Sequence, residues 1–235
     1  MDVDGFYYFE LQAGGVYFMS GSLNYADDGV TYVLIFNKDM QKTYSNTVPD
    51  PYKTARDGEW TLEYFNNVIQ GISADNGDGK WNELDTYGFI NTWEYGNTFF
   101  IGSDLRYINN TGADGEITLF LSDKAQMEKA LNVLELSQAI YHNNNASYMS
   151  PPGQEGLGQT AFKENRGLFY GEVVNHLTPL TQEMETEFGI LPVPKYDEKQ
   201  ENYVNFADGW CISPVVVPNS VKSAERSGLI IEALA

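Results

Sequence analysis

Two aromatic residues and one carboxylate, Trp93, Glu94 and Tyr95, follow the apolar run at 88–90 after two polar residues. That run has the aromatic and β-branched content of a strand, so the three residues are predicted to lie at a strand end. Aromatic rings stack on the apolar faces of sugars, and carboxylates accept hydrogen bonds from hydroxyl groups. These residue types therefore fit a polyhydroxylated ligand. The alternative is that Trp93 packs in the core and that Glu94 is only solvated.

A second group of the same chemistry follows the strand pattern at 168–170. Tyr170 closes that run, and Glu172 and Asn175 come after it. Between them, Gly171 allows close approach of the backbone to another group, and we expect the strand to end there. Ligands of open α/β sheets lie beyond the strand ends, so both groups are predicted to share one site. Trp210, from a predicted strand at 206–217, is a further candidate stacking ring.

The segment 74–85, ADNGDGKWNELD, resembles a calcium-binding loop of the EF-hand type. Aligned on Gly79, its oxygen ligands would be Asn76, Asp78, the Lys80 carbonyl, Asn82 and Asp85. Ala74 replaces the acidic first ligand, and aspartate replaces the bidentate glutamate at the last position, so Ca²⁺ affinity is expected to be weak. The alternative is a tight Gly-Asp-Gly turn that keeps its shape without metal. No other cofactor is predicted.

Helix and strand patterns alternate along the chain and must position these groups. Thr61 precedes apolar residues at helical spacing over 62–72, as an N-cap would. Asn37, Ser122 and Ser223 are predicted to cap three further helices. Thr178 is followed by proline and is predicted to cap a short acidic helix.

Composition limits the class of protein. At 235 residues the chain is long enough for one large domain or two smaller ones. Hydrophobic residues make up 42% and the net charge is −19, which together indicate a globular chain that repels nucleic acid and anionic lipid. The single cysteine, Cys211, excludes an intrachain disulfide and is expected to be a buried thiol.

The chain ends carry none of the usual boundary signals. Residues 1–4 lack the pattern of a signal peptide, and no run of about 18 apolar residues occurs. The apolar stripe of the last predicted helix still continues at Ala235. We therefore expect a sequence that is truncated at both ends.

The run from 167 to 203 combines a strand, a turn, an acidic helix and the extended segment Ile190-Leu191-Pro192-Val193-Pro194. It closely resembles the corresponding run of the extracellular solute-binding proteins of ABC importers, the family that includes maltose-binding protein. Similar phrases occur in the family's order at 36–39, 57–62, 78–81, 85–88, 217–218 and 225–233.

This resemblance implies an α/β fold of the periplasmic-binding-protein type II. Residues 1–36 would form crossing strands and a first-lobe remnant. Residues 37–190 would form the second lobe, and 191–235 the hinge crossover with a truncated first-lobe strand and helix. The second lobe would present Trp93, Glu94 and Tyr95 to an interlobe cleft, and Trp210 would reach it from the hinge.

The resemblance also implies capture of a small solute, expected to be a carbohydrate, for delivery to ABC permease subunits. Such proteins are monomeric and either extracellular, with a membrane anchor, or periplasmic. The resemblance implies that half of the cleft lies outside this sequence, so we expect weak binding by the chain alone. One alternative is a glycoside hydrolase with a carboxylate pair drawn from Glu94, Glu172 and Asp208. Another alternative is a calcium-dependent interaction module. We expect no enzymatic activity, since no Ser-His-Asp order, P-loop or HExxH motif occurs in the sequence.

Overall fold

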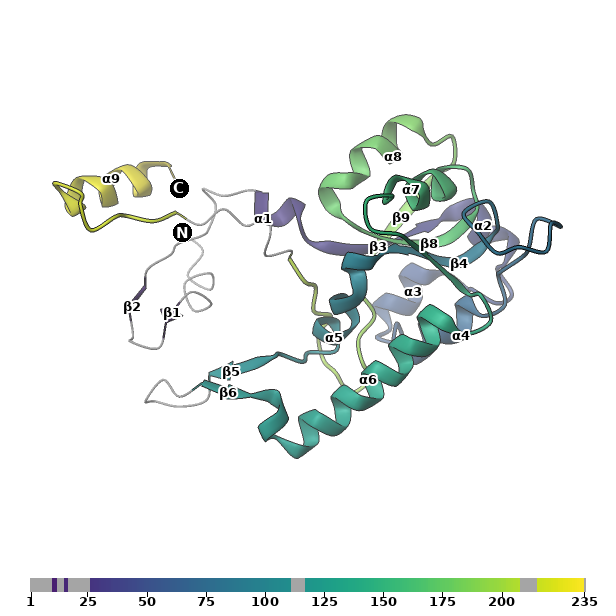
Figure 1. The fold of residues 1–235 in the computed structure, drawn as a ribbon, viewed down its shortest axis with the longest axis horizontal. Coiled ribbons are helices and arrows are strands. Elements are labelled where there is room, and N and C mark those ends of the chain that lie inside the picture. Colours follow the sequence, from purple (N-terminus) through teal and green to yellow (C-terminus); the bar gives the residue numbers. More distant parts are fainter. Residues whose placement is uncertain (1–9, 12–14, 17–25, 111–116, 208–214, 235) are drawn as a thin grey trace. The chain divides into compact units, whose positions relative to one another are not determined.

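A computed structural model describes residues 10–11, 15–16, 26–110, 117–207 and 215–234 (Figure 1). The chain divides into two compact units. Unit 1 comprises Met1–Thr31, Tyr107–Leu119 and Ala207–Ala235, and unit 2 comprises Tyr32–Arg106 and Phe120–Phe206. Asp208, Trp210 and Cys211 lie outside the described residues.

Unit 2 is built on a five-stranded sheet in the order β7-β4-β8-β3-β9. Its strands are β3 (Tyr32–Asn37), β4 (Tyr87–Thr92), β7 (Ser147–Ser150), β8 (Gly167–Val173) and β9 (Phe188–Leu191). β4 runs parallel to β7 and β8, whereas β3 runs antiparallel to β8 and β9. The predicted α/β class is confirmed.

Helices cover both faces of this sheet, with α7 and α8 on one face and α4 and α6 on the other (Figure 1). The α-helices of unit 2 are α2 (Lys38–Thr43), α3 (Pro51–Arg56), α4 (Leu62–Ile69), α5 (Thr98–Gly102), α6 (Lys124–His142), α7 (Gly156–Lys163) and α8 (Leu177–Glu183). Short 3-10 helices are η2 (Trp93–Asn97), η3 (Phe120–Ser122) and η4 (Val174–His176).

The interior strand β3, which lies between β8 and β9, contributes to both cores. Tyr32, Leu34 and Phe36 join the cluster beneath α4 and α6, and Val33 and Ile35 join the cluster beneath α7 and α8. Side chains alternate between the faces of a strand, so each face of the sheet receives apolar residues. A strand that is buried on both faces reads as a continuous apolar run, which is the pattern found in the sequence.

Two predicted helix starts are confirmed by their capping bonds. The Thr61 hydroxyl accepts the Tyr64 N–H at 3.2 Å at the start of α4. The Asn37 side-chain oxygen accepts the N–H groups of Asp39 and Met40 at 3.0 and 2.9 Å, at the start of α2. Both caps satisfy backbone donors that have no partner within the helix.

Two other predicted starts are wrong, one by one residue and the other by two. Ser122 ends η3, and the next residue, Asp123, caps α6, because its carboxylate accepts the N–H groups of Ala125 and Gln126. Thr178 lies inside α8, which begins at Leu177. There η4 leads directly into the helix, so the preceding turn sets its entry and no side-chain cap is formed.

The prediction that the strand ends at Gly171 is also wrong, since β8 continues to Val173. The expected close approach at this glycine is confirmed. A Cβ atom on Gly171 would meet ring atoms of Tyr95 at 2.7 to 2.9 Å, below any normal contact distance. Glycine therefore lets the Tyr95 ring lie directly on the strand without interrupting the strand.

Unit 1 contains short elements. They are β1 (Glu10–Leu11), β2 (Gly15–Val16), α1 (Ala26–Gly29), β5 (Ile108–Asn110), β6 (Ile117–Leu119) and α9 (Ala224–Leu234). The predicted cap of the last helix is confirmed, because the Ser223 hydroxyl accepts the Arg226 N–H at 3.2 Å. The three-part domain division predicted from the sequence stays a prediction. Among the described residues, no helix combines the length and apolar content needed to cross a bilayer.

Candidate functional site

The parallel strands β4, β7 and β8 end at one edge of the sheet of unit 2. Thr92 and Ser150, the last residues of β4 and β7, pair with each other, and β8 runs in the same direction beside β4. We call this the carboxyl edge and define it by the segments 92–97, 150–155 and 172–177. In open α/β sheets, ligands bind outside the carboxyl ends of the strands. The carboxyl edge is therefore the candidate site.

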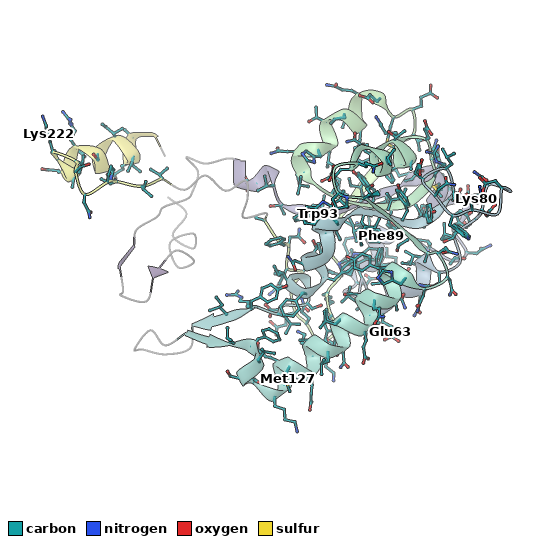
Figure 2. All side chains as sticks on the ribbon, in the orientation of Figure 1. Glu63, Lys80, Phe89, Trp93, Met127 and Lys222 are labelled. Carbon is teal, nitrogen blue, oxygen red and sulfur yellow. The ribbon has the colours of Figure 1, made fainter. Side chains whose placement is uncertain are left out.

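Trp93 is the most accessible aromatic ring of this edge, with 49% of the residue exposed (Figure 2). Its indole N–H donates to Oε1 of Glu155 at 3.3 Å, and that oxygen also accepts the Gly153 N–H at 2.7 Å. The backbone N–H groups of Glu155 itself and of Gly153 hold the pKa of the Glu155 carboxyl below its ordinary value, and the indole adds to this effect. The ring of Trp93 is thus fixed beside an ionised carboxylate.

Glu155 lies in a Pro- and Gly-rich loop and was not among the residues that the sequence predicted for the site. The structure shows that this loop follows β7, a four-residue strand. Tyr148 and Met149 were the only apolar signal of that strand. So short a run does not distinguish a strand from a loop.

Tyr95 has a packing role in unit 2. It is fully buried, and its ring makes edge contacts with Tyr32 and Phe99 at centroid distances of 5.5 and 5.6 Å. Burial raises the pKa of its hydroxyl well above the ordinary value. The backbone of Glu94 lies between Trp93 and Tyr95 in η2, and its side chain is outside the described part of the chain.

Glu172 forms the centre of a polar cluster at the end of β8. Its Oε2 accepts the Tyr170 hydroxyl at 2.8 Å, and its Oε1 accepts the Val173 N–H at 2.8 Å. The Nδ1 atom of His176 lies 3.1 Å from Oε1. Burial, and then the charge of Glu172, raise the pKa of Tyr170, which keeps its hydroxyl protonated as a donor. His176 was not among the residues that the sequence predicted for this site.

The structure therefore places the predicted residues at different depths. Trp93 and Asn175 are exposed at the carboxyl edge, and Glu172 is nearly buried there. Tyr170 is 1% exposed and its ring stacks on Phe162 at 5.3 Å, so it supports Glu172 from within the core.

Comparison with known proteins identifies the architecture. No family model matches the sequence, and no curated protein matches it significantly. Solved structures do match. One is the ABC substrate-binding protein Lmo0181 from Listeria monocytogenes in complex with cycloalternan, with 15% identity, a TM-score of 0.56, and coverage of 100% of this chain and 51% of that chain.

Two further structures are similar. A family 1 extracellular solute-binding protein from Bifidobacterium longum subsp. infantis has 14% identity, a TM-score of 0.56, and coverage of 100% of this chain and 54% of that chain. The maltose/maltodextrin-binding domain MalE from Bdellovibrio bacteriovorus bound to maltotriose has 17% identity, a TM-score of 0.50, and coverage of 99% and 54%.

The chain has the fold of a solute-binding protein. This confirms, at the level of the fold, the resemblance that the sequence indicated and the type II architecture. The chain spans about half the length of these structures.

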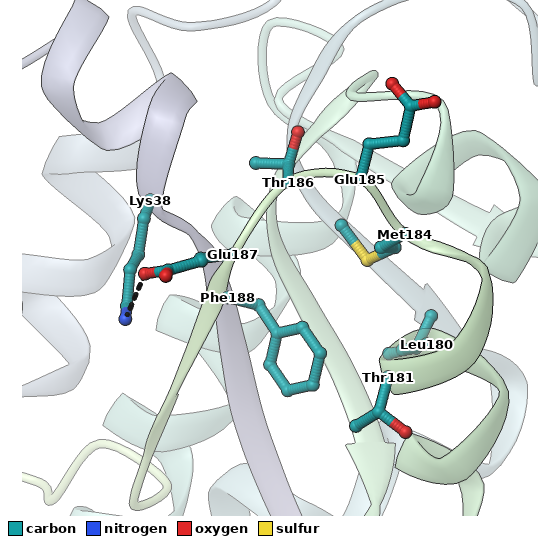
Figure 3. A pocket seen from close by; sticks show the side chains of 8 residues that line it. All are labelled: Lys38, Leu180, Thr181, Met184, Glu185, Thr186, Glu187 and Phe188. Atoms are coloured by element: carbon teal, nitrogen blue, oxygen red, sulfur yellow. Dashed lines mark hydrogen bonds and ion pairs between the residues drawn. The ribbon is translucent and has the colours of Figure 1, made fainter.

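A shallow hollow lies at the end of the sheet opposite the carboxyl edge, between α8 and the start of β9 (Figure 3). Leu180, Met184 and Phe188 supply its apolar lining, and Lys38 pairs with Glu187 across its rim at 3.0 Å. This hollow lies where β3 ends and β9 begins, away from the carboxyl edge.

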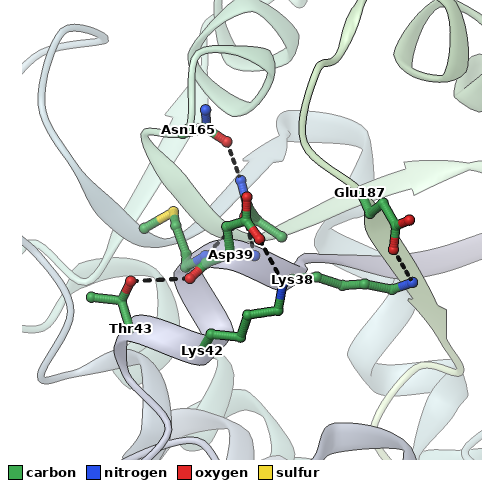
Figure 4. A network of polar contacts seen from close by, with 8 residues as sticks. Lys38, Asp39, Lys42, Thr43, Asn165 and Glu187 are labelled. Atoms are coloured by element: carbon green, nitrogen blue, oxygen red, sulfur yellow. Dashed lines mark hydrogen bonds and ion pairs between the residues drawn. The ribbon is translucent and has the colours of Figure 1, made fainter.

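A polar network fixes the backbone beside this hollow (Figure 4). Asn37 donates to the side-chain oxygen of Asn165 at 2.5 Å while it caps α2. Asp39 pairs with Lys42 at 2.8 Å, and its carbonyl accepts the Thr43 hydroxyl at 3.0 Å. The network explains the predicted role of Asn37 as a cap and holds basic residues at this end of the sheet.

The acidic loop at 74–85 is closed by its own hydrogen bonds. Buried Asp85 accepts the N–H groups of Asn76 and Asn82 at 2.8 and 2.7 Å. The side chains of Asn76, Asp78 and Asn82 accept N–H groups two residues further on. Among the described residues no three acidic, histidine or cysteine side chains gather as a metal site would require. The predicted calcium site at Asn76, Asp78, Lys80, Asn82 and Asp85 stays a prediction, and no step of the proposed function depends on it.

We expect Asp85→Ala to lower the free energy of unfolding by about 1–3 kcal/mol, because two backbone donors lose their acceptor in a buried position. Chemical denaturation followed by circular dichroism measures this loss. The control is Asp78→Ala, since Asp78 is exposed and accepts one N–H; about 0.5 kcal/mol or less is expected. Equal losses in both variants would contradict the role of Asp85. Calorimetry on the unsubstituted chain should detect only weak Ca²⁺ binding.

Proposed function

We propose that this chain is part of the solute-binding component of an ABC importer and that it contacts a carbohydrate at the carboxyl edge. The observation that carries the proposal is Trp93, an exposed indole fixed by Glu155 at the end of β4. A ring held in this way offers a flat apolar face, while nearby carboxylates accept hydroxyl hydrogen bonds. Two of the similar structures contain maltotriose and cycloalternan, both carbohydrates.

The remaining parts of the role are proposals on the same basis. We infer a small-molecule solute, a permease partner and an extracellular or periplasmic location, and we expect a monomer without enzymatic activity. Asn175 and Trp210 remain proposed contacts, as do Glu94 and Glu172. Tyr95 and Tyr170 are proposed to act indirectly, by supporting the edge from within the core.

The test is a panel of neutral sugars that includes maltotriose, measured by ligand-observed NMR because weak binding is expected of the 235-residue chain. Trp93→Ala should weaken binding by about 1–3 kcal/mol, which corresponds to about five- to 150-fold, if the ring stacks on the sugar. Trp81→Ala is the matched control, because Trp81 is 41% exposed but lies on the acidic loop before β4. Unchanged affinity in Trp93→Ala would contradict the site.

The glycoside hydrolase alternative predicts a different result. A carboxylate pair would turn over aryl glycosides, and replacing one carboxylate would abolish that activity. We expect no turnover in such a screen. Turnover that Glu172→Gln removes would replace the binding proposal with an enzymatic one.

A further inference from the structure

Three acidic residues lie on the carboxyl edge, Glu94, Glu155 and Glu172, and its segments contain no lysine or arginine. Its one basic side chain is that of His176, whose Nδ1 atom lies 3.1 Å from Oε1 of Glu172. Three basic residues of neighbouring elements lie at the other end of the sheet. Lys38 follows the end of β3, Lys163 ends α7 and Arg166 precedes β8.

Those cations are also engaged with acidic residues of their own end. Lys38 pairs with Glu187 at 3.0 Å, and Lys163 pairs with Glu183 at 2.5 Å. Arg166 pairs with Glu164. These three cations are therefore paired with acidic residues away from the carboxyl edge.

Of the two carboxylates of this edge whose side chains the structure describes, Glu172 is the more buried, with its side chain 10% exposed. The Tyr170 hydroxyl and the Val173 N–H donate to it, and the His176 Nδ1 atom lies 3.1 Å from it. An ionised carboxylate has about four lone-pair sites on its two oxygens, so it can still accept a hydrogen bond from a ligand hydroxyl. Salt weakens interactions of buried charges much less than those of exposed charges.

We propose that the carboxyl edge selects uncharged polyhydroxylated solutes and excludes anionic ones, such as uronic acids and sugar phosphates, with Glu172 as the specificity-determining residue. This inference rests on the proposed function, since it concerns the same site. A neutral sugar places hydroxyl donors against the carboxylates. A ligand carboxylate or phosphate would place a second negative charge there. The edge segments contain no arginine or lysine to compensate for it, and His176 already faces Glu172.

The experiment compares three probes that differ at one carbon: methyl glucoside, methyl glucuronide, and the methyl ester of that glucuronide. The ester keeps the added bulk of the glucuronide but removes its charge. We expect the glucuronide to bind at least about tenfold more weakly than both neutral probes, from like-charge repulsion in a poorly screened position. Titrations of the chain by ligand-observed NMR, at low and at physiological salt, measure the three affinities.

Glu172→Gln is the decisive variant, because it keeps the size and one acceptor oxygen but removes the charge. It should reduce the difference between glucuronide and ester to about threefold or less at both salt concentrations. Glu155→Gln is the matched control at a less buried position, and its smaller effect should disappear at the higher salt. Circular dichroism checks that both variants keep the fold.

The possible results distinguish a failure of the charge selection from a failure of the proposed function. Equal binding of all three probes overturns the charge selection and leaves the proposed function standing. A glucuronide and an ester that are equally weak also overturn it, because bulk would then be the cause. If neither neutral probe binds, the proposed function and this inference both fail.

Discussion

Trp60→Ala should lower the free energy of unfolding by about 3–5 kcal/mol, the usual cost of removing a buried aromatic side chain. Trp60 is fully buried, and its ring contacts Tyr64, Phe65 and Phe169 at centroid distances of 5.8, 5.6 and 5.5 Å. Its indole N–H donates to the carbonyl of Pro192 at 2.9 Å. The variant therefore opens a cavity beneath the sheet and also leaves a backbone acceptor without its donor.

Denaturant unfolding followed by circular dichroism measures this loss, which is a large share of the 5–15 kcal/mol typical of domains. Trp81→Ala is the control, since it removes an indole that is 41% exposed, and about 0.5 kcal/mol is expected. Trp60→Phe keeps most of the ring volume and should lie between the two. If both alanine variants lost the same amount, the packing described for Trp60 would be wrong.

Gly171→Ala should cost about 1–3 kcal/mol, the range found when atoms are added to a well-packed core. The new methyl group would lie 2.7 to 2.9 Å from the ring of Tyr95. That ring cannot easily move, because it is fully buried between other aromatic residues. Since Tyr95 belongs to the same 3-10 helix as Trp93, the displacement should also weaken sugar binding.

The matched control is Gly96→Ala, because a Cβ atom there would meet no heavy atom within 4 Å. Both glycines have ordinary backbone angles, so the comparison isolates the steric contact. Unfolding experiments and sugar titrations on the two variants test the two effects separately. A Gly171→Ala variant as stable as Gly96→Ala would show that Tyr95 does not lie against the strand.

Much of the framework of unit 2 could be predicted from local patterns. The apolar run of β3 and the caps at Thr61 and Asn37 depend on residues close together in the sequence, and all three are confirmed. Trp93 was found because a strand signal precedes it and because its ring chemistry is distinctive.

The rest depends on contacts between distant segments. Glu155 accepts a hydrogen bond from Trp93 across two different loops, and no local sequence pattern predicts that contact. Tyr95 was predicted to face a ligand, but the space above Gly171 lets its ring enter the core. Whether a carboxylate such as Glu172 is nearly buried depends on its neighbours in space, and those follow only from the sheet order.

The position of β3 within its sheet determines how long this strand stays unpaired while the protein is synthesised. Ile35 pairs with Tyr170, so 135 residues of chain separate the two partners (170 − 35). At ribosomal rates of about 5–20 residues per second, this strand waits on the order of 10 s before its neighbour is made. During that time an all-apolar segment has no sheet to join, and unpaired segments of this kind promote aggregation. Nascent chains halted before residue 167 should therefore bind a holdase chaperone, and chains released after residue 206 should not.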